Sequence, residues 1–551
     1  MDFSSRNRTH MLQELQTKEL DVLVLGGGIT GTGIALDAQT RGLDTGLIEM
    51  QDFAAGTSSR STKLIHGGLR YLKQFEIKLV AEVGKERAIV YENAPHVTEP
   101  VRMMLPFYKG GTFNSLSSSV GLSVYDRLAG VKKAERRTMM SAKNALKQEG
   151  ILKSEDLKGA GMYVEYRTDD ARLTMEVAKS AAERGAHLLN YVKAESFIYQ
   201  DKKVIGVHAT DVTNGSSVKI YAKKIINATG PWVDTLREQD RSREGKSIHL
   251  TKGVHLVFSK DRLPLQQAIY FDTPFADGRM MFAIPRDEKV YVGTTDTDYD
   301  GDQTEPGVTA DDMTYIIDAA NAMFPGFHLT KSDIESSWSG VRPLIHEDGK
   351  DPSEISRKDE IFHSESGLMT IAGGKLTGYR KMADTIVTLA ADEIAQETGK
   401  TFPSCQTKAL VLSGGNVGGS KGFPAFKEKI TSDAKTLGLS EAFGQELVTR
   451  YGSNAPEVLN YIRNASPTDH LPKEVHGMLL YSLEHEMTVT PVDFLLRRTS
   501  YLLFDIHRAE HVMDGVVQTM ADHLDWTDEK KKEYVDDLKK QYDLLTLRSI
   551  G

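Results

Sequence analysis

The chain has 551 residues, which is too long for one ordinary domain, and its 40% hydrophobic and 26% charged residues are typical of a globular protein with a large core. Its 77 acidic residues exceed its 68 basic residues, and the net charge of −9 argues against a general nucleic-acid binder. Cys405 is the only cysteine, so an intrachain disulfide and a cysteine metal cluster are both excluded, and a reducing cytoplasm fits this composition.

The first twenty residues lack the apolar core of a signal peptide, and no later stretch supplies the roughly twenty apolar residues of a membrane span. We therefore expect any contact with a membrane to be peripheral. Met11, Leu12, Leu15 and Leu20 could form an apolar stripe that lies on an anionic membrane surface. The alternative is that this stretch packs on its own protein, as such stretches more often do.

A dinucleotide-binding pattern follows the N-terminal segment. The apolar run 22–25 predicts a buried parallel strand, and Gly26, Gly28 and Gly31 then give the spacing GxGxxG. We expect a helix next, with the phosphates of a cofactor at its N-terminus. A second strand should end at Glu49, at the distance from the glycines where an acidic residue binds a ribose hydroxyl. Glu49 favours an unphosphorylated ribose, so the pattern indicates FAD or NAD rather than NADP.

The loop after this second strand is dense in small and hydroxyl side chains. Thr57, Ser58 and Ser59 can donate hydrogen bonds to phosphate oxygens. His66 and Gly67, with another glycine behind them, permit close approach of the backbone to a flat ring. A plain surface loop is the alternative reading.

Two further glycine turns are expected beside the cofactor. Strands over 186–227 return to the first sheet, and Gly230 then resembles the second glycine turn that many flavoproteins have near the cofactor. A last buried strand over 367–372 leads into a third turn, which opens a helix and forms a second anion-stabilising site. The residues of this third turn are Gly373, Gly374, Lys375, Leu376 and Thr377.

The remaining segments indicate two more domains. Residues 251–300 predict antiparallel strands of a second sheet that covers a substrate, and the chain after 402–403 has helical apolar spacing to its end. The fold class is therefore α/β, or α+β over the whole chain, with a Rossmann-like domain, an antiparallel β-sheet substrate domain and an all-α C-terminal domain. We expect these domains to cover 18–95 with 160–250 and 350–400, 96–159 with 251–349, and 401–551.

Five stretches together resemble the FAD-dependent glycerol-3-phosphate dehydrogenases, which are quinone-linked enzymes of the glycine and D-amino-acid oxidase superfamily. They are LGGGITGTGIALDAQTRG, SSRSTKLIHGGLRYL, INATGPWVD, SGVRPL and GGKLTGYRKMA. The resemblance covers about the whole chain, and the first and last stretches resemble the two signature patterns of the family. The lack of a transit sequence and of EF-hand loops indicates a bacterial-type enzyme rather than a mitochondrial one.

The resemblance implies oxidation of sn-glycerol 3-phosphate to dihydroxyacetone phosphate by hydride transfer to FAD, with the electrons passed on to a membrane quinone. It implies a cytoplasmic protein that is attached peripherally to the inner face of the cell membrane. FAD should bind tightly and without a metal ion. The oligomeric state stays open, and a homodimer is among the states allowed.

Five positions are candidates for the chemistry. Arg342, and Arg70 with Tyr71, suit a dianionic phosphate because a guanidinium grips phosphate oxygens in bidentate fashion, and the resemblance implies that the matching residues line the substrate site. Lys375 is placed to stabilise negative charge on the reduced flavin or the forming alkoxide. His255 is the candidate base, because a neutral imidazole near its reference pKa suits proton abstraction at neutral pH.

Several alternatives stay open. His66 and His346 are rivals for the base, a buried structural histidine is the other reading of His255, and an arginine taken alone more often forms an ion pair. Other enzymes on this fold are a glycerol-3-phosphate oxidase that uses oxygen and, less well matched to two phosphate-binding arginines, an amine or amino-acid oxidase. The non-enzymatic alternative is a flavin-binding redox sensor with the helical domain as its interaction module.

Overall fold

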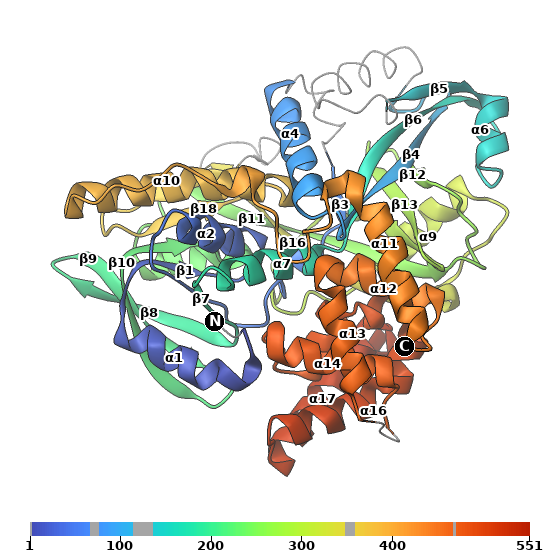
Figure 1. Ribbon diagram of the computed structural model, residues 1–551. Helices are drawn as coiled ribbons and strands as arrows, with labels where there is room; N and C mark the ends of the chain where they lie inside the picture. Colours follow the sequence, from blue (N-terminus) through green and yellow to red (C-terminus); the bar gives the residue numbers. More distant parts are fainter. Residues whose placement is uncertain (1–2, 67–76, 114–135, 348–358, 467–469, 551) are drawn as a thin grey trace.

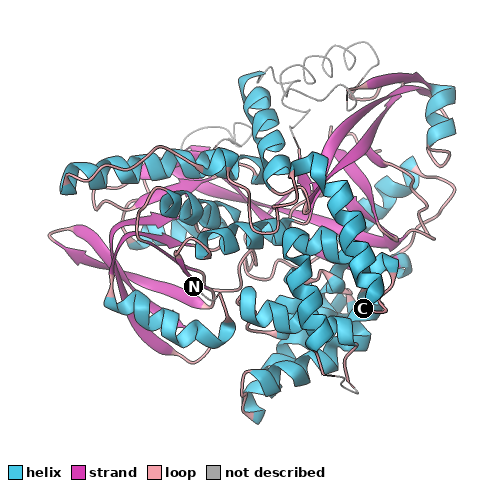
Figure 2. Ribbon diagram, in the orientation of Figure 1, coloured by secondary structure: helices cyan, strands magenta, loops and turns pink. Residues whose placement is uncertain are grey.

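The computed structural model describes residues 3–66, 77–113, 136–347, 359–466 and 470–550. Figure 1 shows two sheets beside each other, with the C-terminal helices, coloured orange to red, packed against them. In Figure 2 the magenta strands of these sheets extend across the molecule and the cyan helices cover them. Within the described ranges, no helix combines the length and the apolar character that crossing a lipid bilayer requires.

The first sheet contains the dinucleotide-binding pattern. Its strands in the described part of the chain are β1 (Glu19–Leu25), β2 (Thr45–Ile48), β7 (His187–Leu189), β8 (Val192–Gln200), β9 (Lys203–Asp211), β10 (Ser216–Asn227), β17 (Glu360–His363) and β18 (Met369–Ala372). They run in the order β17-β18-β10-β1-β2-β7, and β9 joins β8 to β10. The central strands β18, β10, β1, β2 and β7 are parallel, as their nearly continuous apolar runs predict.

The second sheet is mainly antiparallel. Its strands in the described part of the chain are β3 (Leu64–Ile65), β4 (Thr98–Tyr108), β5 (Thr138–Ser141), β6 (Leu157–Thr168), β11 (Lys246–Ser259), β12 (Ala268–Asp272), β13 (Met280–Arg286), β14 (Lys289–Gly293), β15 (Thr297–Asp298) and β16 (Ile334–Glu347). Their order is β15-β11-β14-β13-β12-β4-β6-β3, with β16 paired to β11 and β5 paired to β6. Only the β4–β12 pairing within this part is parallel.

The helices before the C-terminal part are α1 (Arg8–Thr17), α2 (Ile29–Thr40), α4 (Ile77–Asn93), α6 (Ala142–Gln148), α7 (Asp170–Ala182), α8 (Val233–Gln239), α9 (Ala310–Met323) and α10 (Tyr379–Thr398). The C-terminal helices are α11 (Gly419–Thr436), α12 (Glu441–Tyr451), α13 (Ala455–Asn464), α14 (Lys473–His485), the π-helix η10 (Asp493–Arg498), α15 (Tyr501–Phe504), α16 (Ile506–His523) and α17 (Asp528–Leu545). Short turns that matter for the site are η2 (Thr57–Ser59), η4 (Gly230–Trp232) and η7 (Leu376–Gly378).

The expected fold class is confirmed. The unit of strand, glycine turn, helix and strand is present as β1, α2 and β2, and the segment after residue 418 is helical. Between residues 493 and 504 the expected helical structure is divided into η10 and α15. Ser500 lies between them with a φ of 58°, a left-handed conformation that interrupts a right-handed helix.

The expected domain ranges stay a proposal, and three strands of the second sheet do not follow them. β3 lies in a range expected for the first domain, and β11 crosses the expected boundary between residues 250 and 251. β6 crosses the expected boundary between residues 159 and 160, and it pairs with β4 and β3 of the second sheet. An apolar run such as 160–164 has the same pattern in either sheet, so its membership depends on pairing partners far away in the sequence. We therefore propose that residues 157–168 belong with the substrate domain.

The apolar stripe near the N-terminus faces the protein. Met11, Leu12 and Leu15 of α1 and Leu20 of β1 are all buried in the core of the first sheet. This burial contradicts the expectation that the stripe lies on a membrane and supports the alternative. The sequence pattern alone could not distinguish membrane contact from packing on the protein, because both require an apolar helix face.

The first residues also contact the C-terminal helices. Ser4 Oγ donates a hydrogen bond to Glu484 Oε2 at 2.9 Å, and Met487 N donates to the carbonyl oxygen of Phe3 at 3.1 Å. Arg8, in turn, is held by Asp211 of the first sheet at 2.5 Å. The N-terminal segment therefore joins the first sheet to the helical part of the chain.

A web of buried charges joins the same two parts. Asp52, in the loop after β2, accepts hydrogen bonds from Arg497 Nε at 2.5 Å and from Arg498 Nη1 and Nη2 at 2.7 and 2.8 Å. Arg172 of α7 donates to both carboxylate oxygens of Glu486 at 2.9 and 2.8 Å. These charges are buried, so removing one partner leaves the other charge without compensation. Breaking one buried pair in this way typically costs about 3–5 kcal/mol of stability.

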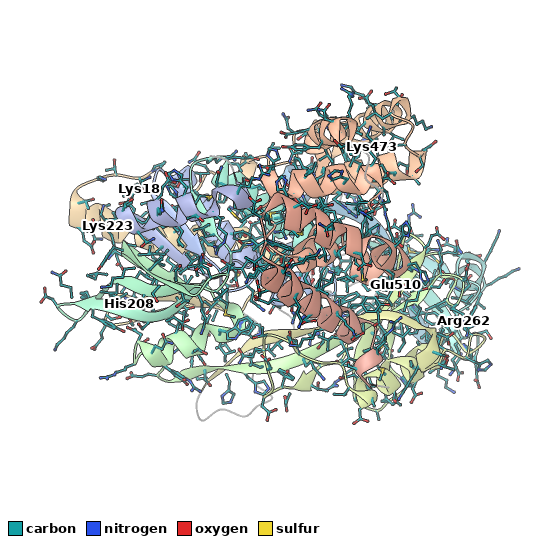
Figure 3. The ribbon with its side chains drawn as sticks, turned by 90° about the horizontal axis from the view of Figure 1, so that it is seen from below. Lys18, His208, Lys223, Arg262, Lys473 and Glu510 are labelled. Carbon is teal, nitrogen blue, oxygen red and sulfur yellow. The ribbon has the colours of Figure 1, made fainter. Side chains whose placement is uncertain are left out.

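Figure 3 shows the molecule from below. The helices beside Glu510 cross in front of the sheets, and those around Lys473 project at the top of the view, while Lys18 and Lys223 lie at the end away from Arg262. Part of the helical domain therefore lies over the sheets and part of it projects from them.

We expect Asp52→Asn to lower the thermal midpoint of unfolding more at pH 7 than at pH 3. Burial alone would raise the pKa of Asp52, but Arg498 and Arg497 lower it from 3.8 to about 2, which corresponds to about 2–3 kcal/mol. Because the pKa is lower in the folded chain, ionised Asp52 stabilises the fold above about pH 4, and this contribution is lost as the pH falls towards 2. Thermal unfolding followed by circular dichroism across this range tests the prediction.

The exposed residue Asp536 provides the control, since Asp536→Asn removes a carboxylate that has no buried partner among the residues that the structure describes. Its effect should be small at both pH values. A difference between wild type and Asp52→Asn that stays constant from pH 7 to pH 3 would contradict the prediction.

Candidate functional site

A cavity of about 540 Å³ lies at the carboxyl ends of β1, β2 and β10, between the first sheet and the second. Ligands of open parallel sheets bind at this edge, and the volume suits a cofactor or small-molecule site. The predicted residues that line it are Gly26, Gly28, Glu49, Thr57, Ser58, His66, Gly230, His255, Arg342, Gly373, Gly374, Lys375, Leu376 and Thr377. The fold therefore brings together residues that are more than 300 positions apart in the sequence.

Among the described residues, Gly31, Ser59 and the rival base His346 do not line this cavity. Gly31 packs inside α2, and Ser59 lies behind the cavity wall, where its carbonyl oxygen accepts a hydrogen bond from Lys63 Nζ at 2.9 Å. Of the rival bases, His66 lines the cavity and His346 does not. The remaining predicted positions, Gly67, Arg70 and Tyr71, lie outside the described residues.

The glycines of the first turn differ in what they make room for. Gly26 has a φ of +109°, and a Cβ there would lie 2.6 Å from the carbonyl oxygen of Ala228; a Cβ at Gly31 would lie 1.9 Å from the oxygen of Gly26. These two glycines are required by the fold itself. A Cβ at Gly28, with an ordinary φ, would approach only the Ser58 side chain, at 3.0 Å from its hydroxyl. Gly28 therefore leaves space on the cavity side, as close approach of a pyrophosphate requires.

Glu49 is fixed at the end of β2. Its Oε2 accepts a hydrogen bond from Gly27 N at 2.6 Å, and its Oε1 accepts one from Gln51 N at 2.8 Å. Burial raises the pKa of Glu49, and these two backbone donors oppose that shift. Each carboxylate oxygen keeps a further acceptor position, which fits ribose hydroxyls as donors.

The loop with η2 is attached to α2 and to the second sheet. Ser58 Oγ accepts a hydrogen bond from Ile29 N at the start of α2, at 2.9 Å. Thr57 Oγ1 donates to the carbonyl oxygen of Val341 in β16, at 2.6 Å. The Thr57 hydroxyl was expected to donate a hydrogen bond to a phosphate, but in this structure it donates to a carbonyl oxygen of β16. Thr57 therefore ties the cofactor loop to the second sheet.

His255 lies in β11, with 1% of its surface exposed. Its ring stacks on Trp338 of β16, with 4.7 Å between the centroids and 9° between the planes. Nε2 lies 3.1 Å from Thr62 Oγ1, whereas Nδ1 is buried and has no hydrogen-bond partner in the described part of the chain. Burial lowers the pKa of His255 well below 6.5, and the charges of Arg342 and Lys63 lower it further.

A pKa near the reference value, as expected from the sequence, is wrong for this histidine. The sequence gives no measure of burial, and burial is the largest cause of the shift. The imidazole is consequently neutral throughout the neutral pH range and can accept a proton there.

Arg342 lies in β16 and is half-buried. Its Nη1 lies 3.1 Å from Asp296 Oδ1, and its Nη2 donates to Thr294 Oγ1 at 2.8 Å. A Cβ at Gly253, on the neighbouring strand, would lie 2.1 Å from Arg342 Nη2, so only glycine there leaves space for the guanidinium. The guanidinium thus lies over the paired strands β11 and β16, at the wall of the cavity.

Several residues around these groups were not identified from the sequence. Thr62 and Trp338 contact His255, while Thr294 and Asp296 contact Arg342. The signal that could have found Trp338 is the strand register, since it lies directly opposite His255 in the β11–β16 pair. Neither strand contains a local pattern that fixes this register.

Two family models match the chain. The model described as FAD dependent oxidoreductase matches residues 21–380, and the model described as the C-terminal domain of alpha-glycerophosphate oxidase matches residues 405–531. A relative named aerobic glycerol-3-phosphate dehydrogenase, from Bacillus subtilis (strain 168), is 55% identical over 541 residues, covering 98% of this chain and 97% of the relative. A relative of the same name from Staphylococcus aureus (strain MRSA252) is 53% identical over 542 residues, with the same coverage.

Solved structures give the same grouping. The glycerol-3-phosphate dehydrogenase from Bacillus halodurans, complexed with FAD, is 48% identical with a TM-score of 0.85, and the match covers 99% of this chain and 98% of that one. The L-alpha-glycerophosphate oxidase from Mycoplasma pneumoniae has a TM-score of 0.54 at 18% identity, covering 71% of this chain and 97% of that one, so it shares the fold.

We expect Gly28→Ala to fold but to lose FAD, and Gly31→Ala to fail to fold. The Cβ added at Gly28 meets only a movable hydroxyl in the protein but enters the space that a pyrophosphate would use, while the Cβ added at Gly31 collides with backbone. The flavin-to-protein absorbance ratio and the circular dichroism of the purified proteins provide the measurement. A Gly28→Ala protein that purifies with full flavin would show that the pyrophosphate lies elsewhere.

Proposed function

Because the chain belongs to the FAD dependent oxidoreductase family, we propose that it oxidises sn-glycerol 3-phosphate to dihydroxyacetone phosphate. The observation that supports this most is that one cavity is lined by a glycine cradle fit for FAD, by a buried neutral imidazole and by an arginine on the strand paired with that of the imidazole. FAD, when bound, supplies the acceptor for the hydride of the alcohol carbon. The names of the relatives support glycerol 3-phosphate as the substrate.

In this proposal His255 takes the proton of the substrate hydroxyl at Nε2. Nε2 is better placed than Nδ1, because Nδ1 is fully buried whereas Nε2 lies beside the Thr62 hydroxyl at the cavity wall. The stacked ring of Trp338 restricts the imidazole to one plane. A positioned base of this kind typically contributes about 10²–10⁴-fold to a rate.

Arg342 binds the substrate phosphate, and Lys375 stabilises the negative charge that develops during the reaction. A guanidinium offers two parallel donors to phosphate oxygens, and Arg342 is half-exposed towards the cavity while Asp296 and Thr294 fix its orientation. Lys375 lies just before η7 in the third glycine turn, on the same cavity. By the family resemblance, Arg70 and Tyr71 complete the phosphate site.

The proposed electron acceptor is a membrane quinone, reached by peripheral attachment to the inner face of the cell membrane. Its support is the resemblance to quinone-linked enzymes. An oxidase that passes electrons to oxygen is the alternative enzyme, and a redox sensor that does not turn over is the alternative binding protein.

We expect Arg342→Ala to lower kcat/KM for glycerol 3-phosphate by roughly ten- to more than a hundredfold, because a charge-assisted hydrogen bond contributes about 1.5–3 kcal/mol. Arg342→Lys keeps the charge but loses the planar fork, so it should fall between wild type and Arg342→Ala. The loss should be specific to the phosphorylated substrate. Anaerobic flavin reduction by glycerol 3-phosphate and by glycerol measures both effects.

Arg262 gives a matched control, since it is an exposed arginine paired with Asp333 at the far edge of the same domain (Figure 3). Arg262→Ala should leave both reactions unchanged. If the preference for the phosphorylated substrate survives in Arg342→Ala, the phosphate is held elsewhere, with Arg70 the next candidate.

We expect turnover with a short-chain quinone to exceed turnover with oxygen, and anionic lipid vesicles to bind the protein in a way that salt reverses. Quinone reduction and hydrogen peroxide release, measured on one preparation, separate the two enzymes. Peroxide in equal amount to the oxidised substrate would favour the oxidase, and no turnover with either acceptor would favour the sensor.

The mass of the protein in solution, measured on the same preparation, distinguishes a monomer from a homodimer.

A further inference from the structure

The C-terminal helices share one hydrophobic core with the second sheet. This core includes Val257, Tyr291 and Trp338 from strands of the sheet, together with Leu479, Phe494, Leu502, Val512 and Leu538 from the helices. A separate interaction module would have a core of its own. The helices instead complete the burial of one face of the sheet that holds His255 and Arg342.

Phe504, the last residue of α15, contacts two aromatic rings that lie beside His255. Its ring lies 5.8 Å from the ring of Trp338 and 6.0 Å from that of Tyr291, at interplanar angles of 66° and 62°. The guanidinium of Arg286 lies over the Phe504 ring at 4.0 Å. Edge-to-face contacts of this kind hold aromatic rings in defined orientations.

The two rings that Phe504 touches both contact His255. Trp338 stacks on the imidazole at 4.7 Å, and Tyr291 meets it edge-on at 6.3 Å. Both rings also bond to the cofactor loop, because Trp338 Nε1 donates to the carbonyl oxygen of Ser61 at 3.0 Å and Tyr291 OH donates to that of Thr62 at 3.2 Å. A displaced Trp338 would therefore move both the imidazole and the Thr62 hydroxyl beside it.

Helix α15 is fixed at both ends. Ser336 Oγ of β16 donates to the carbonyl oxygen of Leu503 at 2.5 Å. Ser500 Oγ donates to Asp169 Oδ2 at 3.0 Å, and Arg286 Nη2 lies 3.0 Å from the same oxygen. Phe504 thus belongs to a helix that is held by hydrogen bonds, and its ring packs against Trp338 and Tyr291.

We propose that Phe504 is a positioning residue for the oxidation, and that the helical C-terminal domain holds His255 in place through Phe504 and Trp338. This proposal rests on the proposed role of His255 as the base. It assigns to the helical domain a part in catalysis, in addition to its contribution to stability.

Phe504→Ala tests the proposal. We expect kcat for glycerol 3-phosphate to fall by about tenfold or more, since a displacement of about 1 Å at a catalytic group costs about a hundredfold, while KM changes by less than about threefold because Arg342 keeps its contacts. Phe504→Tyr keeps the ring and should restore most of kcat. Phe504→Leu keeps apolar volume without a ring, so it should behave like Phe504→Ala and replaces it if that variant does not fold.

The pH profile of kcat is a readout that lost stability alone would not change. In the wild type, activity should fall only well below pH 6.5, because the base must be neutral and burial lowers the pKa of His255. In Phe504→Ala we expect water to reach the imidazole of His255. The acidic limb of the pH profile should then move up towards pH 6.5. The charged groups facing His255 are unchanged: Arg342 of β16, with Asp296 beside it, and Lys63, which is paired with Asp170 of α7.

Leu502→Ala is the matched control, because it removes a fully buried aliphatic side chain from the same helix. It should lower the thermal midpoint but leave the pH profile of kcat unchanged. His255→Gln, measured in parallel, should lose most of the turnover. If it does and the Phe504 variants behave like Leu502→Ala, this proposal alone is overturned; if His255→Gln keeps wild-type turnover, the base assignment fails and the proposal fails with it.

Discussion

The geometry of the site depends on the antiparallel pairing of β11 with β16. Within this ladder His255 lies opposite Trp338 and Thr251 lies opposite Arg342, four residues further along. A spacing of four keeps side chains on one face of a strand, so the proposed base, its stacking partner and the proposed phosphate ligand face the same way. A slip of one residue would turn all of them to the opposite face. Between these two pairs of residues, Gly253 lies opposite Gly340. Because neither has a side chain, the guanidinium of Arg342 packs against the backbone of Gly253, and Arg60 of the loop after β2 packs against that of Gly340.

Burial and charge act in the same direction on His255. Removing the imidazole from water disfavours its charged form, and the charge of Arg342 disfavours that form further, so the imidazole stays neutral. Arg342 itself is half-exposed, and Asp296 and Thr294 hold its guanidinium. Covering one face of the sheet with helices therefore favours the neutral state of the imidazole. A more open sheet would weaken this effect.

Local patterns in the sequence predicted the parts of the fold that form from neighbouring residues. The unit of β1, α2 and β2 was predicted because strand, glycines and acid follow one another within thirty residues, and the C-terminal helices because their apolar spacing repeats. Pairings over long sequence distances left no such pattern. Asp52 meets Arg498 across 446 positions, and His255 meets Thr62 across 193. The pKa of His255 could not be predicted for the same reason, since it depends on what covers the ring.

The contacts of the first residues with the C-terminal helices bear on how the protein is made. The partners of Ser4 and Phe3 are Glu484 and Met487, near the opposite end of the chain. A ribosome that adds about 5–20 residues per second needs roughly half a minute to a minute and a half to reach them. During that time the N-terminal segment, Asp52 and Arg172 are without their partners. The dinucleotide-binding unit is thus synthesised long before its contacts with the C-terminal helices can form.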